Sequence, residues 1–485
     1  MDLIYDIVKK LRKQEIRQIK QLIRQSPFEY DKMGKLFDLV TRHDMQEESF
    51  YAQKLYGKEP DNTFRVTKSR LKRIMENVLL NDKSLSGYPE AITTKLQIRK
   101  RLLQGEILLG RGAYIAAKNL LLQVIAAAQK YDLYDEHFEA ELLLARNLSV
   151  RTPVKEYEKH TQKLLQINRL KASIHEAQIL YYSISNLLLN KVLKPDQKDE
   201  VRKQIDQMKG IADETHHPQV LNLYFLAEIY YLQIDSRDQE ALAVCQQYVV
   251  LLQREPTLYS KQRLAVAYGH LAQVNLRLGR NAEARHFATQ ALSMFSPEEM
   301  NYLRGLELCF IIAYHDRAYD EAHTLIEQAR THPEFDTSRL SVARWHYFQA
   351  CLYFGRGAFQ EAYHALNETT PLLADKYGTN LNIRLLEIMI MYEMAHLDLL
   401  EAKILNMRQF IKRTQKNEEL RRPKLLLRLL ARWHKHQFDF AKTIEESATD
   451  LRALDRMPGG SVLHNPSIDL VRLEDWMKEK AARQG

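Results

Sequence analysis

The stretch LLGRGAYIAA at residues 108–117 returns as YFGRGAFQEA at residues 353–362. Both copies contain G-R-G-A followed by an aromatic residue, and both end in an alanine three positions later. A phosphate-binding G-x-G follows a β-strand and opens a helix, whereas helix-forming residues precede LLGRG. The second glycine of each copy, Gly112 or Gly357, is therefore predicted to reverse the chain between two helices.

The closing alanine of this stretch marks a repeat. Segments of similar character end in the same residue at Ala117, Ala241, Ala284, Ala322, Ala362, Ala402 and Ala441. From Ala241 onward the intervals are 38 to 43 residues, and a sustained period near 40 predicts a helical solenoid. Each unit consists of an apolar helix, a turn marked by a glycine such as Gly279, and a second helix. The small alanine lets the two helices approach closely. The longer gap between Ala117 and Ala241 predicts about three further units.

The pattern resembles the tetratricopeptide repeat (TPR). The unit that begins at Ile98 carries four residues of the family pattern, namely Gly105, Gly112, Tyr114 and Ala117, and units from Ala265 and Ala343 match similarly. The 34-residue spacing of the family is not kept, so longer helices or loops are expected. The resemblance implies a right-handed α-solenoid of TPR-like helix pairs that binds a protein or peptide on its concave face.

Length and composition agree with an all-α array. The chain has 485 residues, 45% of them hydrophobic, with only 16 Gly and 13 Pro. Such a chain exceeds one ordinary core and is rich in helix formers. We predict a small helical domain at 1–90, the solenoid at 95–455 and a capping helix at 466–485. Within the first domain, helices are expected at 3–24, 30–41, 47–56 and 63–81.

Positive charge is concentrated in two places. Residues 1–100 carry a net charge of +7 and residues 401–436 carry +8, against +9 for the whole chain. Such patches are typical of contacts with acidic partners, although charge runs are also common on solvated helix faces. The candidate contacts are basic residues in two predicted helices: Arg65, Lys68, Arg70, Lys72 and Arg73, and Arg421, Arg422, Lys424, Arg428 and Arg432.

The helix expected at 63–81 leaves two interpretations of the N-terminal domain open. It can cap the first repeat, or it can act as the second helix of a helix-turn-helix that enters a DNA major groove. The region resembles the leading part of uncharacterised bacterial TPR-like proteins. The leading hypothesis is an interaction scaffold, and the alternative is a peptide-responsive regulator with an N-terminal DNA-binding domain. A protein or peptide is thus the first candidate partner and nucleic acid the second.

Signals for catalysis, metals and membranes are missing from the sequence. It contains no HExxH, GxSxG or GxxxxGK[ST] motif, so we expect no enzymatic activity, cofactor or metal. The three cysteines, Cys245, Cys309 and Cys351, lie far apart and favour a reducing compartment. Charged residues at the N-terminus exclude a signal peptide, and no apolar run is long enough to span a membrane. A cytoplasmic protein is therefore expected.

Overall fold

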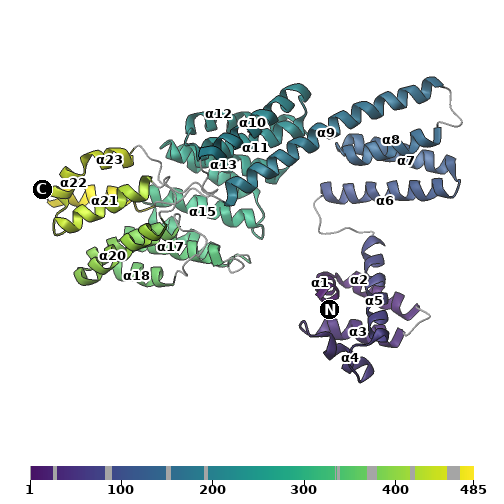
Figure 1. Cartoon of the computed structure of the whole chain (residues 1–485), viewed down its shortest axis with the longest axis horizontal. Helices are drawn as coiled ribbons and strands as arrows, with labels where there is room; N and C mark the ends of the chain where they lie inside the picture. Colours follow the sequence, from purple (N-terminus) through teal and green to yellow (C-terminus); the bar gives the residue numbers. More distant parts are fainter. Residues whose placement is uncertain are drawn as a thin grey trace. The chain divides into compact units, whose positions relative to one another are not determined.

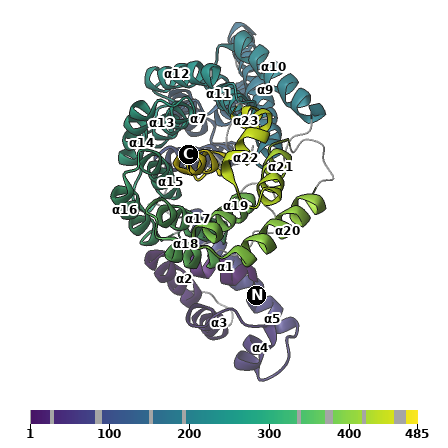
Figure 2. The ribbon, with the colours of Figure 1, turned by 90° about the vertical axis from the view of Figure 1, so that its left-hand side faces the viewer.

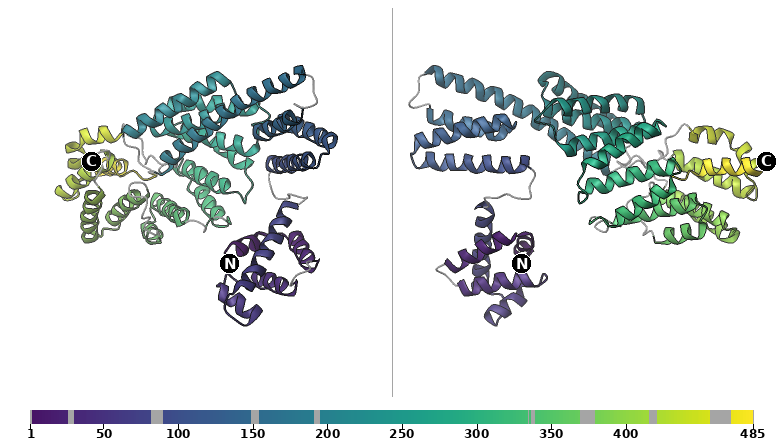
Figure 3. Two further views of the ribbon diagram at one scale, coloured as in Figure 1. Left: turned by 45° about the vertical axis from the view of Figure 1, so that its right-hand side comes forward. Right: turned by 180° about the vertical axis from the view of Figure 1, so that it is seen from behind.

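The computed structural model describes residues 2–25, 30–81, 90–148, 154–190, 195–333, 335, 339–368, 379–414, 421–455 and 470–484. Within these ranges the chain forms 24 α-helices and no β-strand, which confirms the all-α prediction. Sequential helices pack as antiparallel pairs and build an α-solenoid (Figures 1 and 3). None of the helices in the described ranges is both long enough and apolar enough to cross a membrane.

The chain divides into two compact units, residues 1–144 and 145–485. The division falls inside a helix, within the span predicted as one solenoid. The helices up to this point are α1 (Asp2–Lys10), α2 (Lys13–Gln25), α3 (Tyr30–Arg42), α4 (Glu48–Tyr56), α5 (Asn62–Asn81), α6 (Glu90–Gly110), α7 (Tyr114–Lys130) and α8 (Tyr134–Leu148).

The second unit holds the longer part of the array. Its helices are α9 (Val154–Asn190), α10 (Pro195–Thr215), α11 (Pro218–Ile234), α12 (Asp238–Arg254), α13 (Lys261–Arg277), α14 (Asn281–Met294), α15 (Met300–His315), α16 (Tyr319–Arg330), α17 (Arg339–Gly355), α18 (Phe359–Asn367), α19 (Thr379–Glu393), α20 (Leu397–Thr414), α21 (Arg421–Lys435), α22 (Phe440–Glu446), α23 (Ala448–Asp455) and α24 (Leu473–Gln484).

The helix predicted at 3–24 is wrong as a single element, because α1 ends at Lys10 and α2 begins at Lys13. The break is stabilised locally, since the Glu15 carboxylate accepts a hydrogen bond of 2.7 Å from the backbone N–H of Arg12. A glutamate three residues into a helix satisfies one of the N–H groups that the first turn leaves without partners.

Seven turns among the described helices share one main-chain geometry, and an eighth, after α21, makes the same two hydrogen bonds but has two residues with positive φ, Gln437 and Phe438. In each of the seven turns one residue has a positive φ, its N–H bonds back to a carbonyl three residues earlier, and the next N–H bonds five residues back at 2.9–3.0 Å. This is a Schellman ending. The positive-φ residues are Gly112, Asp132, Ser236, Gly279, Arg317, Gly357 and Ala395. The glycines of the repeat therefore reverse the chain between helices, as the sequence predicts.

A reciprocal pair of substitutions tests this turn. Gly279 has φ +72° and Ala395 has φ +59°, and a left-handed conformation costs a residue with a Cβ about 1–2 kcal/mol. We expect Gly279→Ala to lower the free energy of unfolding by about 1 kcal/mol. Ala395→Gly should raise it by up to about 1 kcal/mol, because the relief of strain is partly offset by the greater freedom of glycine when unfolded. Urea denaturation followed by circular dichroism measures both changes in the free energy of unfolding. The two changes must have opposite signs.

The position five residues after each positive-φ residue is the packing position of the second helix. It holds Ala117, Ala241, Ala284, Ala322 and Ala362, all fully buried. In the other two turns it holds His137 and Leu400, which are also buried.

The assignments of Ala402 and Ala441 to this position are wrong, because both residues are exposed. In α20 the first intrahelical bond runs from Leu400 N–H to the His396 carbonyl, which places Leu400 where the other units have alanine. At the start of α22 the buried residues are Phe440 and Thr443. The packing position predicted in α20 therefore lies two residues too late. The prediction followed the alanine and not the turn.

Overpacking at Ala284 should be costly. Ala284 is fully buried and clusters with Ala272, Ala288, Leu308 and Ile312, which come from α13, α14 and α15. We expect Ala284→Leu to lower the free energy of unfolding by about 1–3 kcal/mol, because the helices must separate to admit the larger side chain. The same substitution at exposed Ala402 is the matched control and should leave stability within about 0.5 kcal/mol. Equal effects at the two sites would contradict the packing role.

The regular period predicted between Ala117 and Ala241 is not kept. One helix, α9, runs without interruption for 37 residues and takes the place of a helix pair (Figure 1). Its sequence contains neither glycine nor proline, so no residue forces the chain to turn.

Candidate functional site: the concave face and its docked helix

The first helices of the pairs form the inner side of the solenoid. In the second unit, α11, α13, α15, α17, α19 and α21 curve around a central space (Figure 2). Burial raises the pKa of Tyr230 in α11 to about 12, and the charge of Arg304 in α15 opposes this rise. The Tyr230 ring lies 5.2 Å from the ring of His270 in α13, and Arg304 in α15 is exposed.

Neighbouring first helices are joined by a buried ion pair. Arg344 in α17 donates two hydrogen bonds, of 2.9 and 3.1 Å, to the Glu307 carboxylate in α15. The Glu307 side chain is 7% exposed and that of Arg344 is 12% exposed. A pair this enclosed fixes the register of the two helices, since either charge alone would be costly to bury.

The C-terminal helix α24 packs onto this inner side by means of one tryptophan. The Trp476 ring lies 5.6 Å from the rings of Tyr392 in α19 and Trp433 in α21, and 5.3 Å from Phe440 in α22. All three ring pairs are edge-to-face, an arrangement that favours aromatic contact beyond simple burial. Figure 2 shows the C-terminal end of the chain enclosed by the curve of the first helices.

The carboxylate of Glu393 binds two side chains of α24. Glu393, the last residue of α19, accepts a hydrogen bond of 2.7 Å from Trp476 Nε1 and one of 2.7 Å from Lys480 Nζ. Farther along the helix, Glu479 lies 3.7 Å from Arg317 in the turn between α15 and α16. The helix predicted to cap the last repeat therefore also contacts two earlier repeats.

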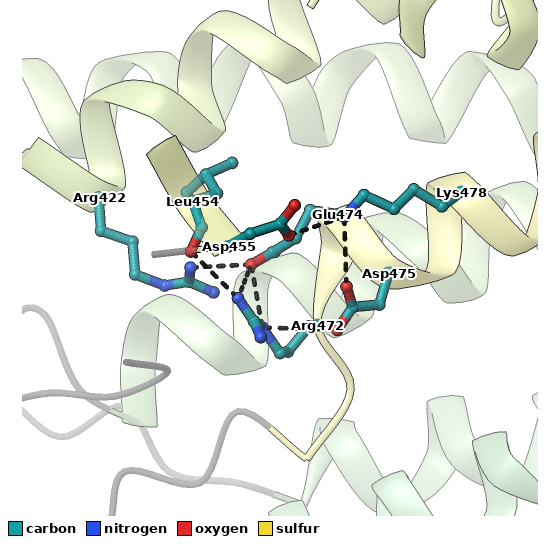
Figure 4. A network of polar contacts seen from close by, with 7 residues as sticks. All are labelled: Arg422, Leu454, Asp455, Arg472, Glu474, Asp475 and Lys478. Atoms are coloured by element: carbon teal, nitrogen blue, oxygen red, sulfur yellow. Dashed lines mark hydrogen bonds and ion pairs between the residues drawn. The ribbon is translucent and has the colours of Figure 1, made fainter. Parts of the chain in front are cut away.

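The start of α24 is held by a buried acidic group. The Glu474 carboxylate is inaccessible to solvent and lies 2.8 Å from Arg422 in α21 and 2.6 Å from Arg472. Burial alone would raise the pKa of Glu474, but Arg422 and Arg472 outweigh it and hold this pKa below its usual value. Figure 4 shows the surrounding contacts, in which Arg472 also donates to the Leu454 carbonyl and Lys478 pairs with Asp455 at 2.7 Å.

Three of the basic residues predicted in α21 form ion pairs with other helices of the chain. Arg428 and Arg432 contact Asp450 of α23 at 2.8 and 2.6 Å, and Arg422 contacts Glu474. Lys424 is half-buried, and the side chain of Arg421 lies outside the described part. Two carboxylates, Asp450 and Glu474, therefore neutralise part of the positive charge that the sequence assigns to an external acidic partner. The sequence could not reveal this, because the carboxylates come from separate helices.

The basic residues of α5 are less engaged. Lys68 pairs with Glu48, and Lys72 lies 3.5 Å from Glu76. Arg65, Arg70 and Arg73 are exposed, while Phe64, Leu71, Met75 and Val78 point into the core of the N-terminal helices. The helix thus has one buried face and one face with basic residues.

Two histidines of the second unit have structural positions. The His217 ring accepts a hydrogen bond from Gln219 N–H and caps α11, and His436 bonds to Glu446. No group of three metal-ligating side chains gathers among the described residues. Cys245 and Cys351 are buried and Cys309 is half-buried, and none of these three described cysteines forms a disulfide.

Thiol reactivity gives a further prediction. Burial raises the pKa of the Cys245 thiol and of the Cys309 thiol to about 12, so both are protonated at neutral pH. Because the thiolate is the reactive form, we expect a thiol reagent to label these cysteines slowly in the native protein and rapidly in urea. Mass spectrometry of peptides measures the labelling of each cysteine. Fast labelling of Cys245 or Cys309 in the absence of urea would contradict this placement.

Comparisons with known proteins concern the fold. No protein-family model and no curated protein matches the chain. Among solved structures, the human IFIT1 dimer with m7Gppp-AAAA is 14% identical, with 94% of each chain covered and a TM-score of 0.37. A STAND protein with a tetratricopeptide repeat sensor from Pyrococcus horikoshii is 12% identical, with 82% of this chain and 63% of that chain covered and a TM-score of 0.39. BtubC from P. vanneervenii is 13% identical, with 47% and 94% covered and a TM-score of 0.37.

The fold is a TPR-like α-solenoid. The paired helices, the Schellman turns and the small residues at the packing positions all belong to this type of array. At 12–14% identity the likeness to the solved structures is one of fold alone.

Proposed function

We propose that this TPR-like solenoid is a non-enzymatic scaffold that holds a protein segment on its concave face. One observation carries the proposal: that face already holds a helix, α24, through an aromatic anchor and ion pairs from several repeats. A surface that orders its own helix has the shape and the chemistry to order another.

The part of the face formed by α11, α13 and α15 offers further contacts. Tyr230 of α11 is half-buried there, and Arg304 of α15 is exposed. Aromatic side chains and arginine are the residues that most often anchor a protein interface.

Site-specific photo-crosslinking tests the proposal. A photoreactive phenylalanine analogue placed at Arg304 in α15 should give a cross-linked product of discrete mass in native cells. The same analogue at exposed Gln328, on the second helix α16, is the matched control and should give none. Equal products at both positions, or none at position 304, would reject the concave face as the binding surface.

A second candidate is the peptide-responsive regulator with an N-terminal DNA-binding domain. It is favoured by the turn between α4 and α5, in which Gly57 adopts φ +69° and α5 begins at Asn62 with exposed Arg65 and Arg73. If α5 contacts phosphates, removing these two arginines should reduce the slope of log affinity against log salt by about 2 on duplex DNA. An unchanged slope rejects this candidate.

A further inference from the structure

The exposed face of α2 carries cations and amides but no carboxylate of its own. The acidic residue of this helix, Glu15, is buried and accepts the N–H of Arg12. Apart from Leu22, every exposed side chain of α2 is a lysine, an arginine or a glutamine, and these are Lys13, Arg17, Lys20, Arg24, Gln14, Gln18, Gln21 and Gln25.

These eight side chains form two parallel rows. The cation row is 13, 17, 20 and 24, and the glutamine row is 14, 18, 21 and 25, so both advance by four, three and four residues. At about 100° per residue, each row stays within about 60° of the helix surface and the two rows lie about 100° apart. Each row is about 16 Å long. The remaining side of α2, with Ile19 and Ile23, packs into the core of the N-terminal helices.

The cation row has little internal neutralisation. Lys20 lies 2.8 Å from Asp38 of α3, and both side chains are about half exposed. No described carboxylate lies within ion-pair distance of Lys13, Arg17 or Arg24. Three of the four cations are therefore available to an anionic ligand, and the fourth is held by an exposed pair that contributes little.

The basic residues of α5 are arranged differently. Its lysines, Lys68 and Lys72, pair with carboxylates. Its exposed arginines are at 65, 70 and 73 and spread over about 140° of the helix surface. A straight ligand cannot meet all three from one side, whereas the cation row of α2 faces one direction.

The chemistry of the two rows matches a nucleic acid. Lysine and arginine contact phosphates, and a glutamine amide offers a donor and an acceptor to the edge of a base such as adenine. The major groove of B-form DNA admits an α-helix, but that of an A-form RNA duplex is too narrow. An acidic protein segment would use the cation row and leave the glutamine row without a defined partner.

We infer that α2 binds duplex DNA in the major groove, with the cation row on the phosphates and the glutamine row on base edges. This inference rests on the second candidate function, a DNA-binding N-terminal domain, and assigns the contact to α2 in place of α5.

The test uses the full chain and a fluorescent DNA duplex of about 20 base pairs, two helical turns. Fluorescence anisotropy at several salt concentrations gives the slope of log affinity against log salt. Replacing the whole cation row with glutamine should reduce this slope by about 3–4. The variant is Lys13→Gln/Arg17→Gln/Lys20→Gln/Arg24→Gln.

A matched control removes the same net charge from exposed positions of the second unit and should leave the slope within about 1. It is Lys203→Gln/Lys209→Gln/Arg254→Gln/Arg280→Gln. Equal slopes for the two variants, or no binding by the unmodified chain, overturn the inference.

Two further variants probe the row chemistry without removing a cation. Changing the glutamine row to alanine should weaken binding at least about tenfold at an unchanged slope, since each paired amide contributes to discrimination between bases. Asp38→Asn releases Lys20 and should tighten binding about twofold or more, a gain that misfolding cannot produce. An unchanged affinity in the first case, or a loss in the second, contradicts the assignment of the two rows.

Competition and a variant of α5 separate the remaining possibilities. If polyglutamate displaces the duplex as well as unlabelled DNA does, the cation row binds any polyanion and the inference is rejected. Equal affinity for an RNA duplex rejects the major groove. If Arg65→Gln/Arg73→Gln reduces the slope and the cation-row variant does not, the DNA-binding domain stands and its contact helix is α5. Cross-linking at position 304 tests the scaffold independently of all these results.

Discussion

Replacing Trp476 with alanine should lower the free energy of unfolding of the C-terminal repeats by about 3–5 kcal/mol. The substitution removes a nearly buried indole from among Tyr392, Trp433 and Phe440 and leaves a cavity that these rings cannot fill. It also removes the indole donor from Glu393. Urea denaturation of the full chain, followed by far-ultraviolet circular dichroism, measures the effect.

The conservative variant separates packing from hydrogen bonding. Trp476→Phe retains most of the aromatic contact and should cost less, about 1–3 kcal/mol, because Glu393 keeps Lys480 as its remaining partner. A loss below about 1 kcal/mol for Trp476→Ala would mean that α24 contributes little to the stability of the repeats it contacts.

Neutralising Glu474 should have the next largest effect. Glu474→Gln leaves Arg422 and Arg472 facing each other without the carboxylate between them. Removing one partner of a buried pair costs about 3–5 kcal/mol. Both arginines keep some exposure, 14% and 26%, so we expect the lower end, about 3 kcal/mol at pH 7.

This effect should depend on pH in one direction. The two arginines hold the pKa of Glu474 below its usual value, so its stabilisation is complete above the unfolded pKa of about 4.3. It is lost as the pH falls through the lower, folded pKa. Urea denaturation should therefore show a large difference in the free energy of unfolding between Glu474→Gln and the unmodified chain at pH 7. The difference should be smaller near pH 3. A constant difference across this range would contradict the role of the charge.

The sequence predicts the array well wherever local rules apply. Gly112, Gly279 and Gly357 mark turns because their left-handed conformation favours a residue without Cβ. The turns at Arg317 and Ala395 use the same geometry with residues that carry no such signal. The packing position in α20 is assigned from sequence to Ala402 instead of Leu400 for this reason. The turn before α20 contains no glycine that would mark it.

The candidate site was less accessible from sequence. The apolar face of the last helix, with Leu473 and Trp476, is visible in the sequence as a period of three to four residues. Glu393, which accepts a hydrogen bond from Trp476, lies 83 residues before it at the end of α19. The contact depends on the curvature of intervening repeats, which no local pattern encodes.

The contacts of α24 also bear on the order in which the chain folds. The helix pairs meet across turns of a few residues, so their loops close at little entropic cost and early. The contacts of Glu393 with Trp476 and Lys480 join residues 83 and 87 positions apart and need several repeats to be in place first. Refolding should therefore end with a separate slow step in which Trp476 fluorescence changes after the helical signal is complete. During that interval the repeats are formed and the space between Tyr392, Trp433 and Phe440 stands open.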